Sequence, residues 1–203
     1  QGALRRIMEQ YAETCRFILS CNYSSKIIEP IQSRCAVFRF RPLPEDQVRE
    51  MIVNVARDEK IELHSEAADA IVHVSLGDLR KAITSLQVAA SLDSNVTREL
   101  IYETTATAPP EELHGYFLAC QQDGFQPARR RLRELLDRFG LAGTDLVNQL
   151  HRELGSVTFF DESQKLRVTE VMAETDFRMV EGGGESLQLD AMTAMICSRI
   201  KEL

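Results

Sequence analysis

Apolar residues recur at helical spacing along most of the chain, most regularly beyond residue 43. Between Val48 and Val55 they follow the i, i+3, i+4, i+7 pattern that gathers side chains on one face of a helix. Comparable stripes continue on both sides of a proline-rich linker at 106–110. The pattern predicts a small all-helical domain over 43–108 and a bundle of about five helices over 109–203.

The first 42 residues have a different pattern. A stripe of apolar residues predicts a helix over 2–13, and short apolar runs at 16–21 and 36–40 predict two strands buried in a parallel sheet. Two strands cannot complete such a sheet, so we expect its other strands upstream of Gln1. The chain also lacks an initial Met, and we expect it to be a piece of something larger. The predicted fold class is mainly α, with the remnant of an α/β core over 1–42.

Start and stop signals predict the helix ends of the segment after residue 43. Pro44 suits the first position of a helix, and Ser65 is a plausible N-cap of the next. Gly77 is expected to end that helix in a left-handed conformation. Asp78 and Thr97 are then expected to cap the two helices that follow.

Charge is distributed unevenly along the chain. The 203 residues contain 24 Lys and Arg against 31 Asp and Glu, a formal net charge of −7. Residues 1–42 hold seven basic and three acidic side chains, whereas 43–108 hold six and twelve and 109–203 hold eleven and sixteen. Phosphate binding needs a local excess of cations, so only the first segment suits nucleic acid. Chance fluctuation in a short segment explains that excess equally well.

Several functional classes are excluded by what the sequence lacks. No apolar run approaches the roughly 18–20 residues of a membrane-spanning helix. The start, Gln1-Gly2-Ala3-Leu4-Arg5-Arg6, has no apolar region of the kind found in signal peptides, so we expect none. Five cysteines without a C-x-x-C pair favour a reducing cytoplasm over disulfides. Four histidines at scattered positions predict no metal site. Without a glycine-rich phosphate loop or a catalytic motif, we expect no self-contained active site.

Two polar residues lie where α/β proteins place ligand-contacting groups. Asn22 follows the first predicted strand, at the edge of the sheet where open α/β folds bind ligands. Arg34 lies in a short turn before the second strand, from which an arginine can reach a phosphate in trans. From spacing alone, an ordinary surface ion pair is the stronger prediction for Arg34.

An arginine-rich run at 128–133 invites a nucleic-acid interpretation. However, Arg130 precedes Glu134 by four residues, and Arg133 precedes Asp137 by four. Pairs at this spacing lie on one helix face. We therefore predict a self-neutralising, solvated face.

Three stretches carry a resemblance to a known family. They are Ala3-Leu4-Arg5-Arg6, LSCNYSSKIIEPIQSRCAVFRF at 19–40, and GDLRKAI at 77–83. In these stretches the chain strongly resembles the replication factor C small subunits, clamp loaders of the AAA+ ATPase family. The resemblance implies that 1–42 is the end of the ATPase core, 43–108 a helical lid, and 109–203 the collar through which subunits associate.

The resemblance also implies roles for single residues. Asn22 matches the sensor 1 position, which polarises the attacking water at a γ-phosphate. Arg34 matches the arginine finger that reaches the ATP of a neighbouring subunit, and Arg80 matches sensor 2. Arg5 and Arg6 match a surface that follows DNA phosphates, although one of them can instead pair with an acid.

The implied function is ATP-dependent loading of a sliding clamp onto primer–template DNA. The implied partners are other clamp-loader subunits, the clamp and DNA, with a homo-oligomer formed through the collar and no membrane. ATP and Mg belong to the intact assembly. The family's phosphate loop and Asp-Glu magnesium box are missing from this sequence. We therefore expect the chain alone to bind neither ATP nor Mg and to be inactive.

Two rival functions come from other classes. One is a non-enzymatic helical oligomerisation module that keeps lid and collar without nucleotide chemistry. The other is a helical DNA-binding regulator, which the acidic balance of residues 43–203 argues against.

Overall fold

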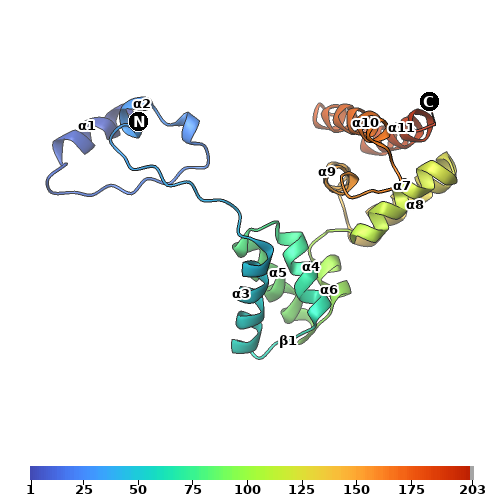
Figure 1. Cartoon of the computed structure of the whole chain (residues 1–203), viewed down its shortest axis with the longest axis horizontal. Helices are drawn as coiled ribbons and strands as arrows, with labels where there is room; N and C mark the ends of the chain where they lie inside the picture. Colours follow the sequence, from blue (N-terminus) through green and yellow to red (C-terminus); the bar gives the residue numbers. More distant parts are fainter. Residues whose placement is uncertain (202–203) are drawn as a thin grey trace. The chain divides into compact units, whose positions relative to one another are not determined.

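The computed structural model describes residues 1–201 of a chain that divides into two units, an N-terminal unit (Gln1–Arg41) and a helical unit (Pro42–Leu203) (Figure 1). Most of the described residues are helical, and their only strands are the two-residue β1 (Glu62–Leu63) and β2 (Asn95–Val96), which pair in parallel. The predicted mainly α fold class is confirmed. Within residues 1–201, no helix is both long and apolar enough to cross a bilayer.

The N-terminal unit contains little regular structure and is held mainly by polar contacts. Its elements are α1 (Gly2–Gln10), a 3₁₀ turn (Ser24–Lys26) and α2 (Glu29–Gln32). The Gln1 side chain donates to the Lys26 carbonyl at 3.0 Å and accepts from the Ile28 N–H at 2.8 Å. Met8 and Ile31 are the only buried residues of this unit.

The two strands predicted at 16–21 and 36–40 do not form. Neither segment has regular secondary structure, and neither pairs with any strand in the described part of the chain. Their apolar side chains remain in solvent: Ile18 is 98%, Phe38 80% and Phe40 96% exposed. A strand satisfies its backbone N–H and C=O groups only through a neighbouring strand, so apolar sequence alone does not create one.

The helical unit carries the remaining helices. In chain order they are α3 (Glu45–Asp58), α4 (Ser65–Ser75), α5 (Leu79–Leu92), α6 (Arg98–Thr104), α7 (Pro110–Gln122), α8 (Phe125–Phe139), α9 (Gly143–Leu154), α10 (Glu162–Val180) and α11 (Glu185–Arg199). Up to residue 201, five helices follow the linker, which is the number that the apolar stripes predict.

The predicted caps at Asp78 and Thr97 are confirmed, whereas the left-handed end of α4 lies at Leu76, one residue before the predicted Gly77. The side chains of Asp78 and Thr97 accept hydrogen bonds from the backbone N–H three residues on, at 3.1 and 3.3 Å. Leu76 ends α4 in the left-handed region, and Gly77 follows at φ +79°. A Cβ on Gly77 would lie 2.7 Å from the Cβ of Pro42, so both the turn and the close contact require glycine here.

Two other helices begin one residue away from the predicted position. Pro44 precedes α3 instead of being its first residue, and Ser65 is the first residue of α4 instead of its cap. The cap position is occupied by His64, whose side chain makes no capping bond and instead contacts Asn95 at 2.6 Å. Local sequence signals do not distinguish adjacent positions at a helix end.

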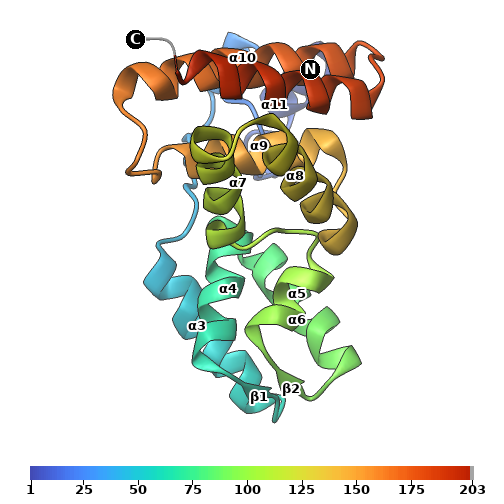
Figure 2. The same cartoon turned by 90° about the vertical axis from the view of Figure 1, so that its right-hand side faces the viewer.

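One hydrophobic core runs through the helical unit, from Val48 on α3 to Ile200 beyond α11. In the bundle, α10 and α11 lie side by side (Figure 2). The buried side chain of Gln149 on α9 accepts from the Ala108 N–H at 2.9 Å and donates to the Ala106 carbonyl at 3.2 Å. The segment before the paired prolines is therefore fixed to the bundle and is not a free linker.

Candidate functional site

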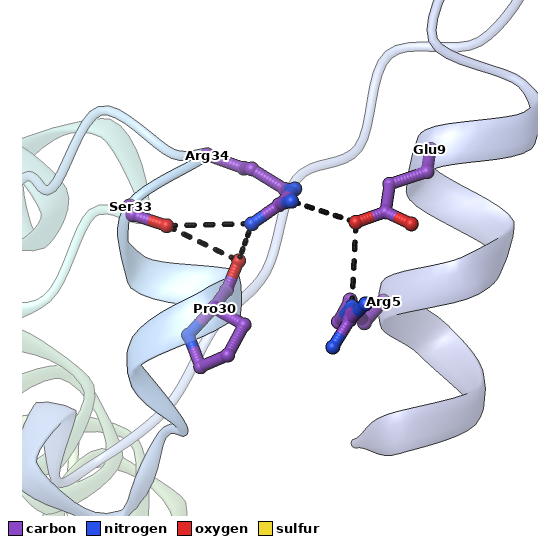
Figure 3. Close-up of polar contacts among 5 residues, drawn as sticks. All are labelled: Arg5, Glu9, Pro30, Ser33 and Arg34. Atoms are coloured by element: carbon purple, nitrogen blue, oxygen red, sulfur yellow. Dashed lines mark hydrogen bonds and ion pairs between the residues drawn. The ribbon is translucent and has the colours of Figure 1, made fainter.

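Arg34 lies in the turn that follows α2, and its guanidinium is held within the N-terminal unit (Figure 3). Its Nη1 donates to the Pro30 carbonyl at 2.7 Å and lies 3.4 Å from the Ser33 hydroxyl. Its Nη2 donates to Glu9 Oε1, also at 2.7 Å. The side chain of Arg34 remains 42% exposed. The ion pair that spacing alone favoured is present, while the role implied by the resemblance stays a prediction.

Glu9 is the residue that sequence reasoning missed. The same atom, Glu9 Oε1, also accepts from Arg5 Nε at 3.3 Å, an i, i+4 pair along α1 (Figure 3). The i+4 spacing of Arg5 and Glu9 is a local sequence signal for their ion pair. No local signal indicates the pair between Glu9 and Arg34, because these two residues are 25 positions apart. Of the two candidate DNA-binding arginines, Arg5 therefore has an acidic partner, and Arg6 is exposed.

Asn22 lies at a bend before the 3₁₀ turn, exposed to solvent, and not at the end of a strand. With Arg34 it lines an open depression of about 1310 Å³ in the N-terminal unit. Much of that lining is apolar and includes Met8, Phe17 and Ile31. Arg16 and Arg39 also line it, so cationic groups are present, but the lining includes no glycine-rich loop whose N–H groups could hold phosphates. This depression alone therefore does not define a nucleotide site.

Arg80 belongs to the helical unit, unlike the other four predicted site residues. It is the second residue of α5, exposed, and its position is fixed by the local backbone. The Asp78 cap holds the Lys81 N–H, and the Gly77 carbonyl accepts from the Leu43 N–H at 3.1 Å. The backbone on which Arg80 lies, at the start of α5, is therefore held by hydrogen bonds on both sides.

The arginines of α8 confirm one predicted pair and overturn another. Arg130 lies 3.9 Å from Glu134, as the spacing indicates. Arg133 instead contacts Asp190 on α11 at 3.2 Å, so its predicted pairing with Asp137 is wrong. Arg129 binds the same Asp190 with two hydrogen bonds of 2.8 and 2.6 Å. Arg129 and Arg133 thus connect α8 to α11. Asp190 also binds Arg129 through both of its oxygens, and such a bidentate pair is stronger than a single contact with a residue on the same helix.

The pKa shifts in the bundle have structural causes. The hydrogen bond from Arg129 lowers the pKa of Asp190 below its usual range. Burial raises the pKa of Tyr116, whose hydroxyl lies 3.1 Å from the Thr193 hydroxyl. A hydrogen bond with Cys197, together with burial, raises the pKa of the Cys120 thiol. All five cysteines are free thiols. Residues 1–201 contain no cluster of three His, Cys, Asp or Glu side chains arranged to bind a metal.

The chain matches proteins of known family over nearly its whole length. Residues 108–195 match the replication factor C C-terminal domain. The chain is 44% identical over 194 residues to the replication factor C small subunit of Methanocella arvoryzae, covering 96% of this chain and 60% of that protein. It is 43% identical over 202 residues to the small subunit of Archaeoglobus fulgidus, covering 100% of this chain and 63% of that protein.

The helical architecture and the matched domain define the class of protein, a helical chain that matches the replication factor C C-terminal domain over residues 108–195. More particularly, the chain is a relative of the archaeal replication factor C small subunits and corresponds to a C-terminal portion of them. It spans about 60% of the length of these curated relatives.

Proposed function

We propose that this chain takes part in ATP-dependent loading of a sliding clamp onto primer–template DNA. The observation that carries the proposal is the placement of Arg34. Its guanidinium lies at the surface, in a turn rigidified by the Pro30 carbonyl, in a chain related to clamp-loader small subunits. Phosphoryl transfer spreads negative charge over the transferred group, and an arginine supplied in trans stabilises that charge.

ATP enters this proposal as a substrate held by a neighbouring subunit. The described residues include neither a glycine-rich loop for its phosphates nor an acidic cluster for Mg. Arg34 would contribute its Nη donors to that nucleotide across the subunit interface. Asn22 would orient the attacking water, and Arg80 would make the lid sensitive to the nucleotide.

Arg5 and Arg6 support a role for DNA. They lie on α1, in the segment where basic side chains outnumber acidic ones by seven to three. Phosphate contacts of this kind are independent of DNA sequence and weaken with salt. The double variant R5A/R6A should weaken duplex binding and flatten its salt dependence, and binding that survives unchanged removes both residues from the proposal.

Association with other subunits through the helical bundle is the second part of the proposal. On α10, the side chains of Leu166, Phe177 and Val180 are 71%, 60% and 70% exposed, and Leu187 on α11 is 70% exposed. Large apolar side chains exposed on these two packed helices support an interface with another subunit. Light scattering after size-exclusion chromatography should give a small integer multiple of 23.0 kDa, and a monomer speaks against a homo-oligomer.

The decisive experiment mixes this chain with a full-length, ATP-competent homologue. The chain should change the homologue's ATPase rate, and R34A should abolish that change. R41A is the matched control, because Arg41 is an exposed arginine of the same unit that does not line the depression around Arg34. If R34A acts like the unaltered chain, the arginine-finger role is wrong. An unchanged rate with a stable complex favours the rival function, an oligomerisation module without nucleotide chemistry.

A further inference from the structure

One carboxylate oxygen in the N-terminal unit serves two arginines. Glu9 Oε1 accepts from Arg34 Nη2 at 2.7 Å and from Arg5 Nε at 3.3 Å (Figure 3). All three side chains are partly exposed, between 39% and 47%. A carboxylate therefore occupies the terminal donor of Arg34 that a phosphate oxygen would use.

We propose that Glu9 is a positioning residue that holds Arg34 in a resting orientation until a phosphate displaces it, and that Arg5 weakens this hold by sharing the same oxygen. The inference rests on the proposed function, because it gives Arg34 an anionic ligand. Neither arginine role implied by the resemblance involves Glu9.

The exchange is physically reasonable because the two anions compete for the same end of one guanidinium. Carboxylate and phosphate oxygens both form charge-assisted hydrogen bonds with it. Nη2 has two N–H groups, but two anions bound side by side repel each other, so each weakens the binding of the other. An exposed ion pair shifts an equilibrium by only about fivefold or less. Glu9 is thus strong enough to bias the orientation of Arg34 and weak enough to release it. The Pro30 carbonyl keeps Nη1 in place during the exchange, because that bond does not involve Glu9.

Removing Arg5 distinguishes this proposal from a merely structural role of Glu9, because the two predict opposite changes in the Glu9–Arg34 contact. Two guanidinium groups share a single negative charge, and the Arg5 contact is the longer of the two. When Arg5 is removed, the whole carboxylate charge is available to Arg34. The hold on Arg34 should then tighten, whereas loss of a structural contact would loosen it.

The test measures how fast phenylglyoxal modifies Arg34 in the 203-residue chain, followed by peptide mass spectrometry. A guanidinium engaged by a carboxylate reacts more slowly than a free one. E9Q should raise the rate about two- to fivefold, and R5A should lower it. The matched controls E13Q and R6A remove the same charges from neighbouring exposed positions and should leave the rate unchanged. Molar salt should shrink both effects.

Two outcomes overturn the proposal: an unchanged rate in E9Q, or a faster rate in R5A. The second variant keeps the test informative if E9Q disturbs α1. In the mixed ATPase assay, E9Q should lower the concentration of chain needed for the half-maximal effect and leave the plateau unchanged. E9Q and R5A can shift the reactivity of Arg34 as expected while R34A affects the mixed ATPase rate no differently from the unaltered chain. In that case the proposed function is wrong, and the role of Glu9 in orienting Arg34 is supported.

Discussion

The N-terminal unit and the helical unit differ in how much of their apolar side chains they bury. In the first, Met8 and Ile31 are buried, whereas Phe38 and Phe40 are largely in solvent. In the second, one continuous core includes residues of every helix. Both stretches are comparably rich in apolar residues, so composition does not explain the difference.

The difference lies in how each backbone satisfies its hydrogen bonds. A helix pairs its own N–H and C=O groups, and packing then needs only one apolar stripe. A strand depends on a second strand, and the segments at 16–21 and 36–40 have none among the described residues. Arg34 lies in the unit with few buried apolar residues, and an ion pair and a carbonyl hydrogen bond orient its side chain.

The largest expected effect on stability distinguishes two phenylalanines, one in each unit. Phe117 is fully buried, with the rings of Tyr116 and Phe160 at 5.6 and 5.7 Å, whereas Phe40 is 96% exposed. F117A should lower the free energy of unfolding by about 3–5 kcal/mol, because it leaves a cavity. F40A should change it by less than about 0.5 kcal/mol. Urea denaturation followed by circular dichroism measures both, and equal losses would contradict the description of the two units.

A smaller loss is expected at the start of the helical unit. G77A places a methyl group 2.7 Å from the Pro42 Cβ and 2.8 Å from the Leu43 carbonyl oxygen, at a positive φ. Backbone strain of this kind costs about 1–3 kcal/mol. G155A is the control, because no atom lies within 4 Å of its new methyl group and its φ is −61°. It should be neutral or slightly stabilising in the same urea titration.

One glutamine in each unit makes side-chain bonds to backbone groups, the buried Gln149 and the half-buried Gln32. Q149L leaves the Ala108 N–H buried without its acceptor, which should cost about 1–3 kcal/mol. Gln32 makes a similar pair of bonds in the N-terminal unit, donating to the Ile27 carbonyl at 2.6 Å and to the Ser24 carbonyl at 2.9 Å. Q32L should leave the thermal unfolding of the helices unchanged. A matching shift in the melting temperature would mean that the two units unfold together.

The smallest effect concerns Asp190 and acid. Its pKa is lowered in the folded state, first by the hydrogen bond from Arg129 and further by Arg133. A lowered carboxyl pKa adds stability above the unfolded-state value of 3.8, and that contribution is lost as pH falls through the folded value. D190N should therefore cost up to about 1 kcal/mol at neutral pH and lose its effect in acid.

Asp137 provides the control for that titration. It is exposed on α8, at the i+4 position that sequence alone assigns to Arg133. D137N should leave the stability unchanged at every pH, since Arg133 bonds to Asp190. If D137N is the more damaging change, the sequence-based pairing is right and the structural one is wrong.

Elements defined by local signals were predictable from the sequence. The caps at Asp78 and Thr97 need only a few neighbouring residues, and both are confirmed. The left-handed end of α4 was predicted to within one residue, at Gly77 instead of Leu76. The resemblance likewise identified the family, which the matches bear out. The roles of Asn22, Arg34 and Arg80 stay predictions, because they concern partners outside this chain.

By itself, then, the sequence determined the helices, their approximate ends and the kinship of the chain, since helical periodicity and short motifs are local properties. The tertiary structure decided which acid each arginine meets. Glu9 and Arg34 are 25 residues apart, and Arg129 and Asp190 are 61 apart. It also decided that the apolar runs at 16–21 and 36–40 pair with no strand among residues 1–201. Contacts of this range depend on how whole elements pack, and no spacing rule along the chain encodes them.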